Sequence, residues 1–482
     1  MKKLRNKSVK LWLLGCMWLA LGAWLIVTNY LQQPPMAQAQ PPEPTRRVMV
    51  PYLDGENAFE QSAIFWFGQV NSTSNYADAR VRYNEDGIIL FVHVFDRWPW
   101  YDETPGIEDL ATWDAVALYL NRDGNVGNTP STNAHRFVAQ LSLNGSRAEY
   151  QAAYRGDGAG WASASTSFTT LSGWRGDGLN GAEARGWWVK FEIPFASLGL
   201  PGPPSEGSTW GLALTLHDRD DEAGNPIPEQ MWPEAMETER PATWGQLVFD
   251  LPSYKRPLAR ADDTVTIRHG LNGASVVDGH VGGHSICPGG PTIWTQWGET
   301  NYQGYEQINI QNQWDVADWP CFSKYYITFP LEAMPPGKTL ISATLRLYHF
   351  GNAGDGYDPG PQPSYIQVLT VAEDWEEASL TWNNAPLALE NVSGAWLDPL
   401  DSYPGWPGVA REWDVSYAVA EAYGGGTDRL RLVLYEADSA RHSGKYFYSS
   451  DAGEAGRPTL EILWGEPLEV VGTAYLPLVV KP

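Results

Sequence analysis

Short apolar runs, each closed by Gly, Pro, Asn or Asp, recur along most of the chain and constrain its fold more than any other feature. The runs are IILFVHVFD (88–96), AVALYLN (115–121), HRFVAQLSL (135–143), WWVKFEIPF (187–195), WGLALTLHD (210–218), WGQLVFD (244–250), YYITFPL (325–331), ATLRLYHF (343–350), YIQVLTVA (365–372), LRLVLYE (430–436), KYFYSS (445–450) and PTLEILW (458–464). Runs rich in β-branched and aromatic residues between turn formers are typical of all-β sandwiches. One helix is predicted at 415–426, where Val415, Val419 and Ala422 share a face and glycines follow.

The chain of 482 residues is too long for one ordinary domain. LPSYKRPLARAD (251–262), with two prolines and several basic residues, has the composition of a linker. We therefore expect an all-β protein of two antiparallel, jelly-roll-like β-sandwiches in tandem after an N-terminal signal or anchor helix. The expected segments are a signal peptide or membrane anchor (1–39), a Pro-rich leader (40–47), a first sandwich (48–251), a linker (252–262), a second sandwich (263–465) and a spacer with a short apolar tail (466–482).

The N-terminus has the layout of a secretory signal. A basic start, MKKLRNKSVK, precedes an apolar run from Leu11 to Val27, and Ala37-Gln38-Ala39 provides a cleavage site. The run is close to the lower length limit for a spanning helix, so an uncleaved anchor is the alternative. We predict a secreted, extracellular or cell-surface protein that contacts a membrane only through an uncleaved N-terminal helix.

Charge and aromatic content narrow the class of partner. Lys and Arg number 33 against 57 Asp and Glu, and the resulting net charge of -24 repels nucleic acid and anionic lipid. Aromatic residues make up 13% of the chain, with 24 Trp. Exposed flat rings suit sugar faces, and the alternative is that these rings fill the core.

Two cysteines, Cys287 and Cys321, remain after removal of the signal. In an exported chain such a pair is expected to form a disulfide. The alternatives are two free buried thiols or half of a metal site.

An ordered series of segments fills the first half. The series runs LDG (53–55), ADARVRYNEDGIILFVHVFD, TWDAVALYLNRDGN (112–125), VKFEIPFASLGL, LALTLHDRDD and MWPE with ATWGQLVFD. It resembles the family-9 carbohydrate-binding modules and their DOMON-like relatives. This resemblance implies a β-sandwich that binds sugars through aromatic rings and polar side chains, often with structural calcium. Ala117 stands where that family carries an acidic residue, so this chain lacks one of the family's usual polar contacts with sugar.

The candidate ligand-binding and metal-binding residues lie in loops of this half. The ligand candidates are Trp98, Trp100, Tyr101, Trp113 and Trp232, and their alternative role is packing at the ends of the sandwich. Asp218, Asp220 and Asp221 offer the hard oxygens that Ca²⁺ prefers, against the alternative of a solvated acidic turn. No Met–His pair marks a haem site, and His280, His284 and Cys287 lack a fourth zinc ligand, so neither haem nor zinc is expected.

The second half resembles the DNRLRE-type β-sandwich domain, which is related to a family of carbohydrate-binding modules. Its most specific part is W-x-E-x-x-L-T-W-N-N-x-P, from Trp375 to Pro386. Asn side chains bond local backbone and Pro fixes the exit, so we interpret this segment as mainly scaffold. An aromatic loop between Cys287 and Cys321 is a candidate second glycan surface, unless it packs upon itself.

Together these features predict an exported, non-catalytic protein that recognises polysaccharide and serves carbohydrate catabolism or surface adhesion. No catalytic residue is assigned: GHSIC (283–287) lacks the last glycine of a nucleophile elbow. One alternative is a structural surface or matrix protein that makes protein contacts. The other is a hydrolase acting on glycosidic bonds. The two expected sandwiches already occupy both halves of the chain, which leaves no room for a separate catalytic domain.

Overall fold

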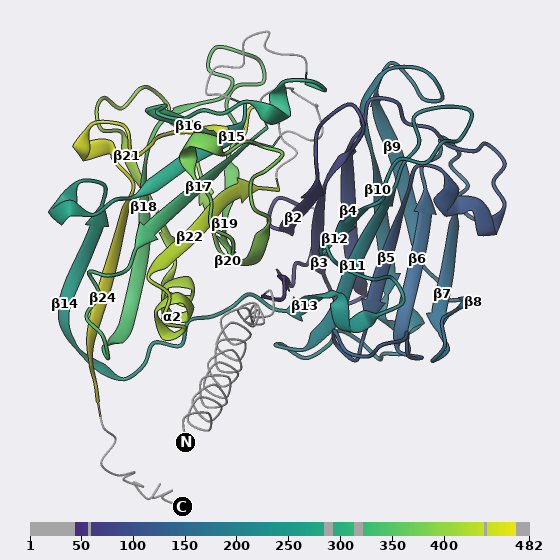
Figure 1. Ribbon diagram of the computed structural model, residues 1–482, viewed down its shortest axis with the longest axis horizontal. Coiled ribbons are helices and arrows are strands. Elements are labelled where there is room, and N and C mark those ends of the chain that lie inside the picture. Colours follow the sequence, from purple (N-terminus) through teal and green to yellow (C-terminus); the bar gives the residue numbers. More distant parts are fainter. Residues whose placement is uncertain (1–43, 56–58, 284–292, 313–321, 438–440, 469–482) are drawn as a thin grey trace, which may run out of the picture. The chain divides into compact units, whose positions relative to one another are not determined.

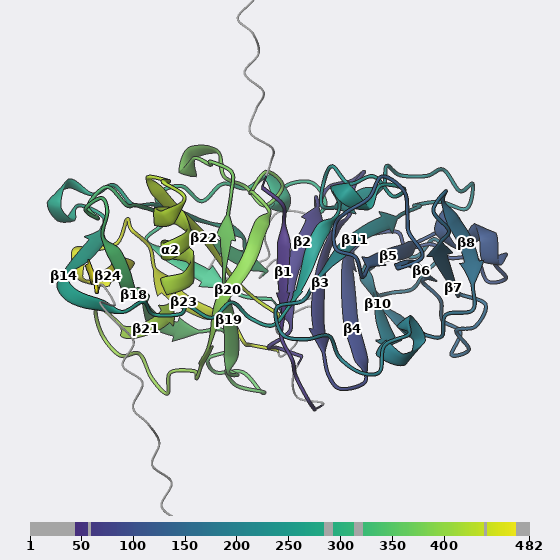
Figure 2. The same ribbon diagram turned by 90° about the horizontal axis from the view of Figure 1, so that it is seen from below.

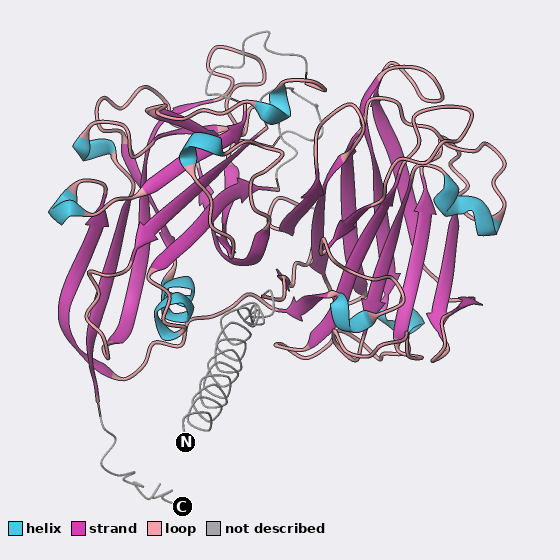
Figure 3. Ribbon diagram, in the orientation of Figure 1, coloured by secondary structure: helices cyan, strands magenta, loops and turns pink. Residues whose placement is uncertain are grey.

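The computed structural model describes residues 44–55, 59–283, 293–312, 322–437 and 441–468 (Figure 1). Residues Thr45–Pro482 form one compact unit. Figure 3 shows that strands dominate this unit and that its helices are short. The predicted all-β class is confirmed at the level of a mostly β chain with several antiparallel sheets.

Two sheets build the first sandwich. The larger has the order β1-β13-β11-β5-β6-β7-β8 with β12 paired to β11, and the smaller has the order β2-β3-β4-β10-β9. The larger sheet contains β1 (Arg47–Val50), β5 (Ala115–Asn121), β6 (Ala134–Gln140), β7 (Gln151–Gly156), β8 (Trp161–Ala164), β11 (Thr209–His217), β12 (Gln230–Trp232) and β13 (Gly245–Phe249). The smaller contains β2 (Ala63–Gly68), β3 (Tyr76–Tyr83), β4 (Gly87–Phe95), β9 (Thr169–Gly176) and β10 (Ala184–Pro194).

Strand β5 shows how the first sandwich is layered. Successive side chains of a strand point to opposite faces of the sheet. Val116, Leu118 and Leu120 enter the main core between the two sheets. Ala117 and Tyr119 enter a second, smaller cluster on the other face, so every residue of β5 is buried. The larger sheet is therefore covered on both faces along this strand.

Two further sheets build the second sandwich, with the orders β14-β24-β18-β23-β16, where β21 pairs β18, and β15-β17-β22-β19-β20. The first contains β14 (Ala259–Arg268), β16 (Gln307–Ile310), β18 (Thr339–Asn352), β21 (Val409–Asp414), β23 (Lys445–Tyr448) and β24 (Thr459–Pro467). The second contains β15 (Val277–Gly282), β17 (Ser323–Pro330), β19 (Ser364–Val371), β20 (Ala388–Leu397) and β22 (Arg429–Glu436).

Helices play a minor part in the described residues. The α-helix α2 (Ser416–Gly424) confirms the helix predicted at 415–426, with Val415 and Val419 buried as expected, and it packs beside β18 and β22 (Figure 2). The 3₁₀ turns are η2 (Ile107–Thr112), η3 (Phe195–Leu198), η4 (Pro241–Thr243), η5 (Leu271–Gly273), η6 (Trp297–Glu299), η7 (Glu377–Ser379) and η8 (Glu454–Gly456). In this part of the chain no helix is long and apolar enough to cross a membrane.

The expected linker is shorter in the structure. Strand β14 begins at Ala259, inside the predicted 252–262 segment, because Ala259 pairs with Pro467 at the end of β24. Tyr254 is also anchored, since its hydroxyl donates to Leu340 O at 2.5 Å. The predicted signal or anchor (1–39), the first half of the Pro-rich leader and nearly all of the C-terminal tail lie outside the described residues.

A third apolar cluster contains residues of both sandwiches. Its members from the first half are Ile64, Trp66, Val70, Tyr76 and Phe95, and those from the second half include Val281, Trp294, Trp297, Phe322, Tyr326, Trp382 and Tyr435. The ammonium of buried Lys324 lies 3.7 Å from the ring centroid of Trp382 and 4.3 Å from that of Trp66. We call this group the shared core.

Polar contacts reinforce the shared core. Asn383 accepts a hydrogen bond from Val70 N at 2.8 Å and donates one to Val70 O at 3.1 Å. Its neighbour Asn384 instead bonds locally, accepting from Thr381 N and donating to Ser379 O. The tryptophan-asparagine segment is thus used as scaffold, and part of it joins the two sandwiches.

Candidate functional site

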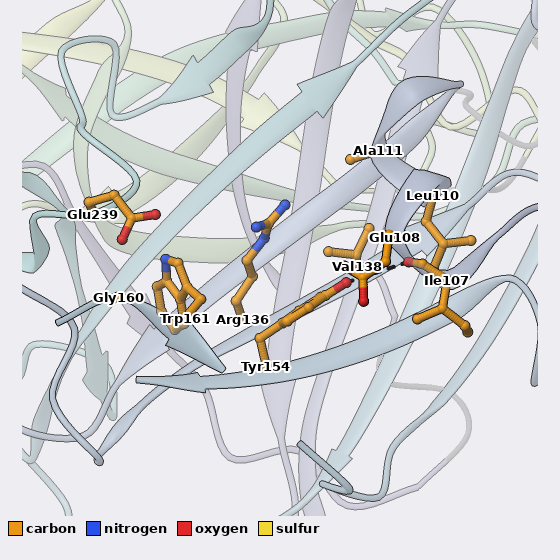
Figure 4. Close-up of a pocket in the computed structure, with 10 residues that line it drawn as sticks. All are labelled: Ile107, Glu108, Leu110, Ala111, Arg136, Val138, Tyr154, Gly160, Trp161 and Glu239. Carbon is orange, nitrogen blue, oxygen red and sulfur yellow. Dashed lines mark hydrogen bonds between the residues drawn. The ribbon is translucent and has the colours of Figure 1, made fainter. Parts of the chain in front are cut away.

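A pocket of about 460 Å³ lies on the outer face of the larger sheet of the first sandwich (Figure 4). Residues of β6, β7, β8, η2 and one loop line it: Ile107, Glu108, Leu110, Ala111, Arg136, Val138, Tyr154, Gly160, Trp161 and Glu239. It combines two aromatic rings, one guanidinium and two exposed carboxylates. We call it the Trp161 pocket.

Strand register places the polar and aromatic side chains of this pocket on one face. Arg136 on β6 pairs with Tyr119 on one side and with Tyr154 on the other. Residues that pair across strands project to the same face, so these three side chains form one row. Phe137, which follows Arg136, points into the main core.

The Trp161 indole is held in place by the smaller cluster beneath it. Its ring stacks on Trp244 with centroids 6.2 Å apart and an angle of 4° between the planes. It also packs against Tyr119 at 5.8 Å. A ring fixed in this way loses little conformational freedom when it binds a ligand.

Arg136 lies between the aromatic rings. Its guanidinium carbon is 5.2 Å from the centroid of Tyr154 and 5.7 Å from that of Tyr119. Figure 4 shows the guanidinium between Trp161 and the segment that carries Glu108. Arg136 Nε and Trp161 Nε1 are buried atoms with no hydrogen-bond partner in the structure. The pocket thus joins a cation to aromatic rings in a space of ligand size.

The floor of the pocket is apolar. Ala117 pairs with Val138, and both side chains are buried on this face. The Ala117 position, where the resemblance expects an acidic side chain, carries only a buried methyl group beneath Val138 and does not itself line the pocket. Polar contacts with a ligand must come from the rim, where Glu108 and Glu239 are exposed.

The predicted ligand residues lie elsewhere, and most have a ring face covered. The guanidinium of Arg97 lies 4.9 Å from the ring centroid of Trp98, and that of Arg219 lies 5.3 Å from that of Trp113. Trp100 is half-buried, and a Cβ built on Gly181 would be 3.4 Å from its ring. These three rings do not line the Trp161 pocket.

Tyr101 and Trp232 belong to the main core of the first sandwich. Trp232 is 1% exposed and packs against Phe65 with ring centroids 4.6 Å apart. The expectation that Trp232 presents its ring to a sugar therefore conflicts with its burial. Strand β12 pairs with β11 and turns this ring inward.

The structure gathers carboxylates from distant parts of the first sandwich. One oxygen each of Asp96, Asp218 and Asp220 lies within 4.8 Å of the others. Asp221, the third predicted calcium ligand, instead accepts hydrogen bonds from Asn225 in its own turn. Asp96, at the end of β4, replaces it in the group. The sequence offered no signal for this, since Asp96 is far from the acidic loop.

Hydrogen bonds separate the roles of these acids. Asp96 accepts from Trp98 N at 2.8 Å and from Trp187 Nε1 at 3.0 Å. Asp114, which is also buried, accepts from Trp100 N at 2.7 Å and from Arg219 N at 2.9 Å. Both acids therefore hold the loops around them.

Asp218 is different, because both of its carboxylate oxygens are buried without a hydrogen-bond partner. Burial and neighbouring carboxylates raise the pKa of Asp218 well above its ordinary value. Burial and the charge of Asp220 raise the pKa of Asp96 to about 7. Burial and the charge of Asp221 raise that of Asp220 to about 6. Unpaired hard oxygens in this electrostatic setting fit a divalent cation.

Other predicted features fall outside the Trp161 pocket. Cys287 and Cys321 lie outside the described residues, so their disulfide stays a prediction. From the aromatic loop between them, Trp294 and Trp297 are buried in the shared core. These two rings pack inside the protein and offer no surface to a ligand.

Sequence reasoning missed Arg136, Tyr154 and Trp161. The available signal was the alternation on β6 and β7, where Arg136 and Tyr154 interrupt otherwise apolar runs. Such outward positions are ordinary solvent contacts in most sandwiches. Only the packing of Trp161 on Trp244 makes them part of a pocket.

Comparison with known proteins finds a family model that is similar to part of the chain. Residues 293–463 match the model of carbohydrate-binding module family 96. This confirms the resemblance seen in the sequence of the second half. No curated protein matches the chain.

Family-9 carbohydrate-binding modules are among the solved structures that are similar to this chain. A family-9 module from Caldicellulosiruptor kristjanssonii in complex with cellotriose has 13% identity and a TM-score of 0.31, and the alignment covers 43% of this chain and 95% of that chain. The same type of module with glucose has 12% identity and a TM-score of 0.31, covering 44% and 98%. A protein from Bacteroides uniformis described as carbohydrate-binding has 12% identity and a TM-score of 0.30, covering 43% and 100%.

Proposed function

We propose that this protein binds polysaccharide, without acting on it chemically, at the Trp161 pocket. The observation that carries the proposal is the pairing of fixed aromatic rings with the Arg136 guanidinium over an apolar floor. A pyranose ring presents C–H groups on its faces and hydroxyls around its edge. Trp161 and Tyr154 match the faces, and Arg136 matches hydroxyl oxygens.

Carboxylates at the rim complete the polar contacts. Glu108 and Glu239 are exposed and can accept hydrogen bonds from sugar hydroxyls. The match of residues 293–463 to a carbohydrate-binding family supports the same class of ligand. We further propose that the chain is exported and that binding serves polysaccharide breakdown or surface adhesion.

Calcium forms the second part of the proposal. Asp96, Asp218 and Asp220 would hold the ion, and Asp218 has the unsatisfied buried oxygens that fit it. The ion would neutralise clustered carboxylates and so stiffen the loop from Trp98 to Trp100, which Asp96 and Asp114 hold. No part of sugar binding is assigned to the ion itself.

The test is affinity electrophoresis of the mature chain in gels containing soluble glycans, with Trp161→Ala as the variant. Trp174→Ala is the matched control, because Trp174 is 39% exposed on β9 and lies outside the pocket. We expect at least one glycan to retard the wild type and the control. For that glycan, the dissociation constant of Trp161→Ala should be at least tenfold higher than that of the wild type.

Three results would contradict this proposal. Equal retardation of Trp161→Ala and wild type on every glycan would show that the Trp161 pocket is not the binding site. No retardation on any glycan, together with self-association or capture of a protein partner, would favour a structural surface protein. Release of reducing sugar from the gel polymers would indicate an enzyme instead.

A further inference from the structure

A group of four aromatic residues lies on the outer face of one sheet of the second sandwich. Tyr448 on β23 packs edge-to-face with Trp406, with ring centroids 4.7 Å apart. It also stacks on Phe350 of β18 at 4.4 Å. Phe447, its neighbour on β23, points into the core, so Tyr448 faces away from it. We call Tyr403, Trp406, Tyr448 and Phe350 the aromatic platform.

The platform is held rigidly from below. A Cβ on Gly453 would lie 2.8 Å from the Trp406 ring, and one on Gly456 would lie 2.7 Å from it. The indole thus rests directly on the backbone of this turn. Burial and a hydrogen bond with the Tyr403 hydroxyl raise the pKa of Tyr448 to about 12. Because these contacts fix the rings in advance, a ligand would not have to order them.

The upper surface of the platform is nevertheless open. Trp406 is 50% exposed and Tyr403 is 65% exposed. Large rings fixed side by side in water are unfavourable unless a partner covers them. Trp406 keeps half of its surface exposed although the glycine turn and Tyr448 both pack against it.

The charges around the platform select the kind of partner. Glu306, Asp401 and Asp451 are exposed on the segments that carry or adjoin the rings. The neighbouring arginines are engaged: Arg411 donates to Asp398 O at 3.0 Å, and Arg457 donates to Ala452 O at 2.9 Å. The surface therefore offers hydrogen-bond acceptors and repels an anionic polymer.

We propose that the aromatic platform is a second glycan-binding site, specific for a neutral pyranose polymer and independent of the Trp161 pocket. Sugar C–H faces stack on Trp406 and Tyr403, and sugar hydroxyls donate to the surrounding carboxylates. This inference extends the proposed function to a second surface, and it rests on that function for the class of ligand.

The experiment uses the mature chain carrying Trp161→Ala, so that the first pocket is removed. Affinity gels contain either a neutral polymer (hydroxyethyl cellulose, laminarin or galactomannan) or a uronate polymer (alginate or polygalacturonate). We expect at least one neutral polymer to retard this variant. Adding Trp406→Ala or Tyr403→Ala should weaken that retardation at least tenfold.

The controls separate folding from binding. Trp396→Ala, in the same background, removes a ring that is 48% exposed on the other sheet of this sandwich, and it should leave retardation unchanged. Tyr403 lies in an exposed loop, so its variant retains the fold even if Trp406→Ala does not. Thermal unfolding of each variant verifies this.

Each remaining outcome is decisive. If Trp161→Ala alone abolishes all retardation that the wild type shows, the platform is not a glycan site and the Trp161 pocket stands. If uronate polymers retard the Trp161→Ala chain as strongly as neutral ones, the assignment to neutral glycans is wrong. If the wild type binds no glycan but captures a protein through Trp406, both glycan sites are wrong.

Discussion

Met49 and Asn391 exchange two hydrogen bonds across the boundary of the two sandwiches. Met49 N donates to Asn391 Oδ1 at 2.8 Å, and Asn391 Nδ2 donates to Met49 O at 2.8 Å. Arg46 adds further contacts there, donating to Leu387 O and Ala388 O at 3.1 Å. The first strand of one sandwich is thus bonded by its backbone to the edge strand of the other.

Asn391→Ala should lower the free energy of unfolding by about 1–3 kcal/mol, because it leaves the buried Met49 N–H and C=O without partners. Urea denaturation followed by tryptophan fluorescence measures this. Asn144→Ala, in an exposed turn, is the control and should change it by less than about 0.5 kcal/mol. A separate, early transition of one half in wild type would show that the two sandwiches unfold independently.

Arg136→Met should weaken glycan binding about tenfold, because it removes the charged donor between Trp161 and Tyr154 while keeping an unbranched side chain. Arg136→Lys should recover only part of the affinity, since an ammonium cannot lie flat between rings. Isothermal titration with the glycan identified by gel electrophoresis gives both values. Equal affinity of the Met variant and wild type would place the ligand away from Arg136.

Calcium should raise the thermal stability of the wild type, by about 2.7 kcal/mol at a concentration of 100 times its dissociation constant. Asp218→Asn should lose this response and, in EDTA near neutral pH, should be more stable than wild type, because folding no longer buries a carboxyl whose pKa is raised well above its ordinary value. Asp221→Asn is the control, since Asp221 bonds only within its turn, and it should respond like wild type. Differential scanning calorimetry with and without EDTA decides the matter, and a calcium response kept by Asp218→Asn would contradict the site.

His349 should make the protein sensitive to acid. Its Nε2 bonds to Gly351 O at 2.9 Å and its Nδ1 accepts from Arg411 Nε at 3.4 Å, an arrangement that holds the ring neutral. Burial, with the charges of Arg411 and Lys445, lowers the pKa of His349 to about 3.

The folded state therefore resists protonation that the unfolded chain accepts below pH 6.5. Stability from this group is fully present above that pH and is lost as the pH falls toward 3. Relative to His349→Gln, the wild type should lose about 2–3 kcal/mol between pH 7 and pH 4.5. Denaturation of both proteins at the two pH values measures the difference, and parallel losses would remove His349 as the cause.

Local patterns predicted the elements better than the site. The range of β5 (115–121) and the helix at 415–426 followed from alternation and from a shared helical face, which are local properties. Whether a tryptophan is open to ligand depends on distant chain. Trp232 lies in a turn-rich sequence yet is buried by strand pairing, whereas Trp161 lies on a short strand and lines a pocket.

The acidic cluster shows the same limit. Asp218 and Asp220 lie two positions apart in the sequence and could be predicted together, and Asp221 appeared equivalent to them. Its hydrogen bonds with Asn225 depend on the path of a single turn. Asp96 joins the group because the end of β4 lies beside the end of β11 in the fold. The spacing of residues along the sequence does not reveal this kind of tertiary contact.

The shared core changes what the two resemblances mean. Each half resembles a different family of modules, and residues 293–463 match a family model of their own. Trp66 and Trp382 lie in one cluster around Lys324, so each half depends on the other to bury the aromatic side chains of the shared core. Cutting the chain at the segment before β14 would expose aromatic surface on both products. In this protein the segment that matches a family model is therefore smaller than the unit that packs as one body.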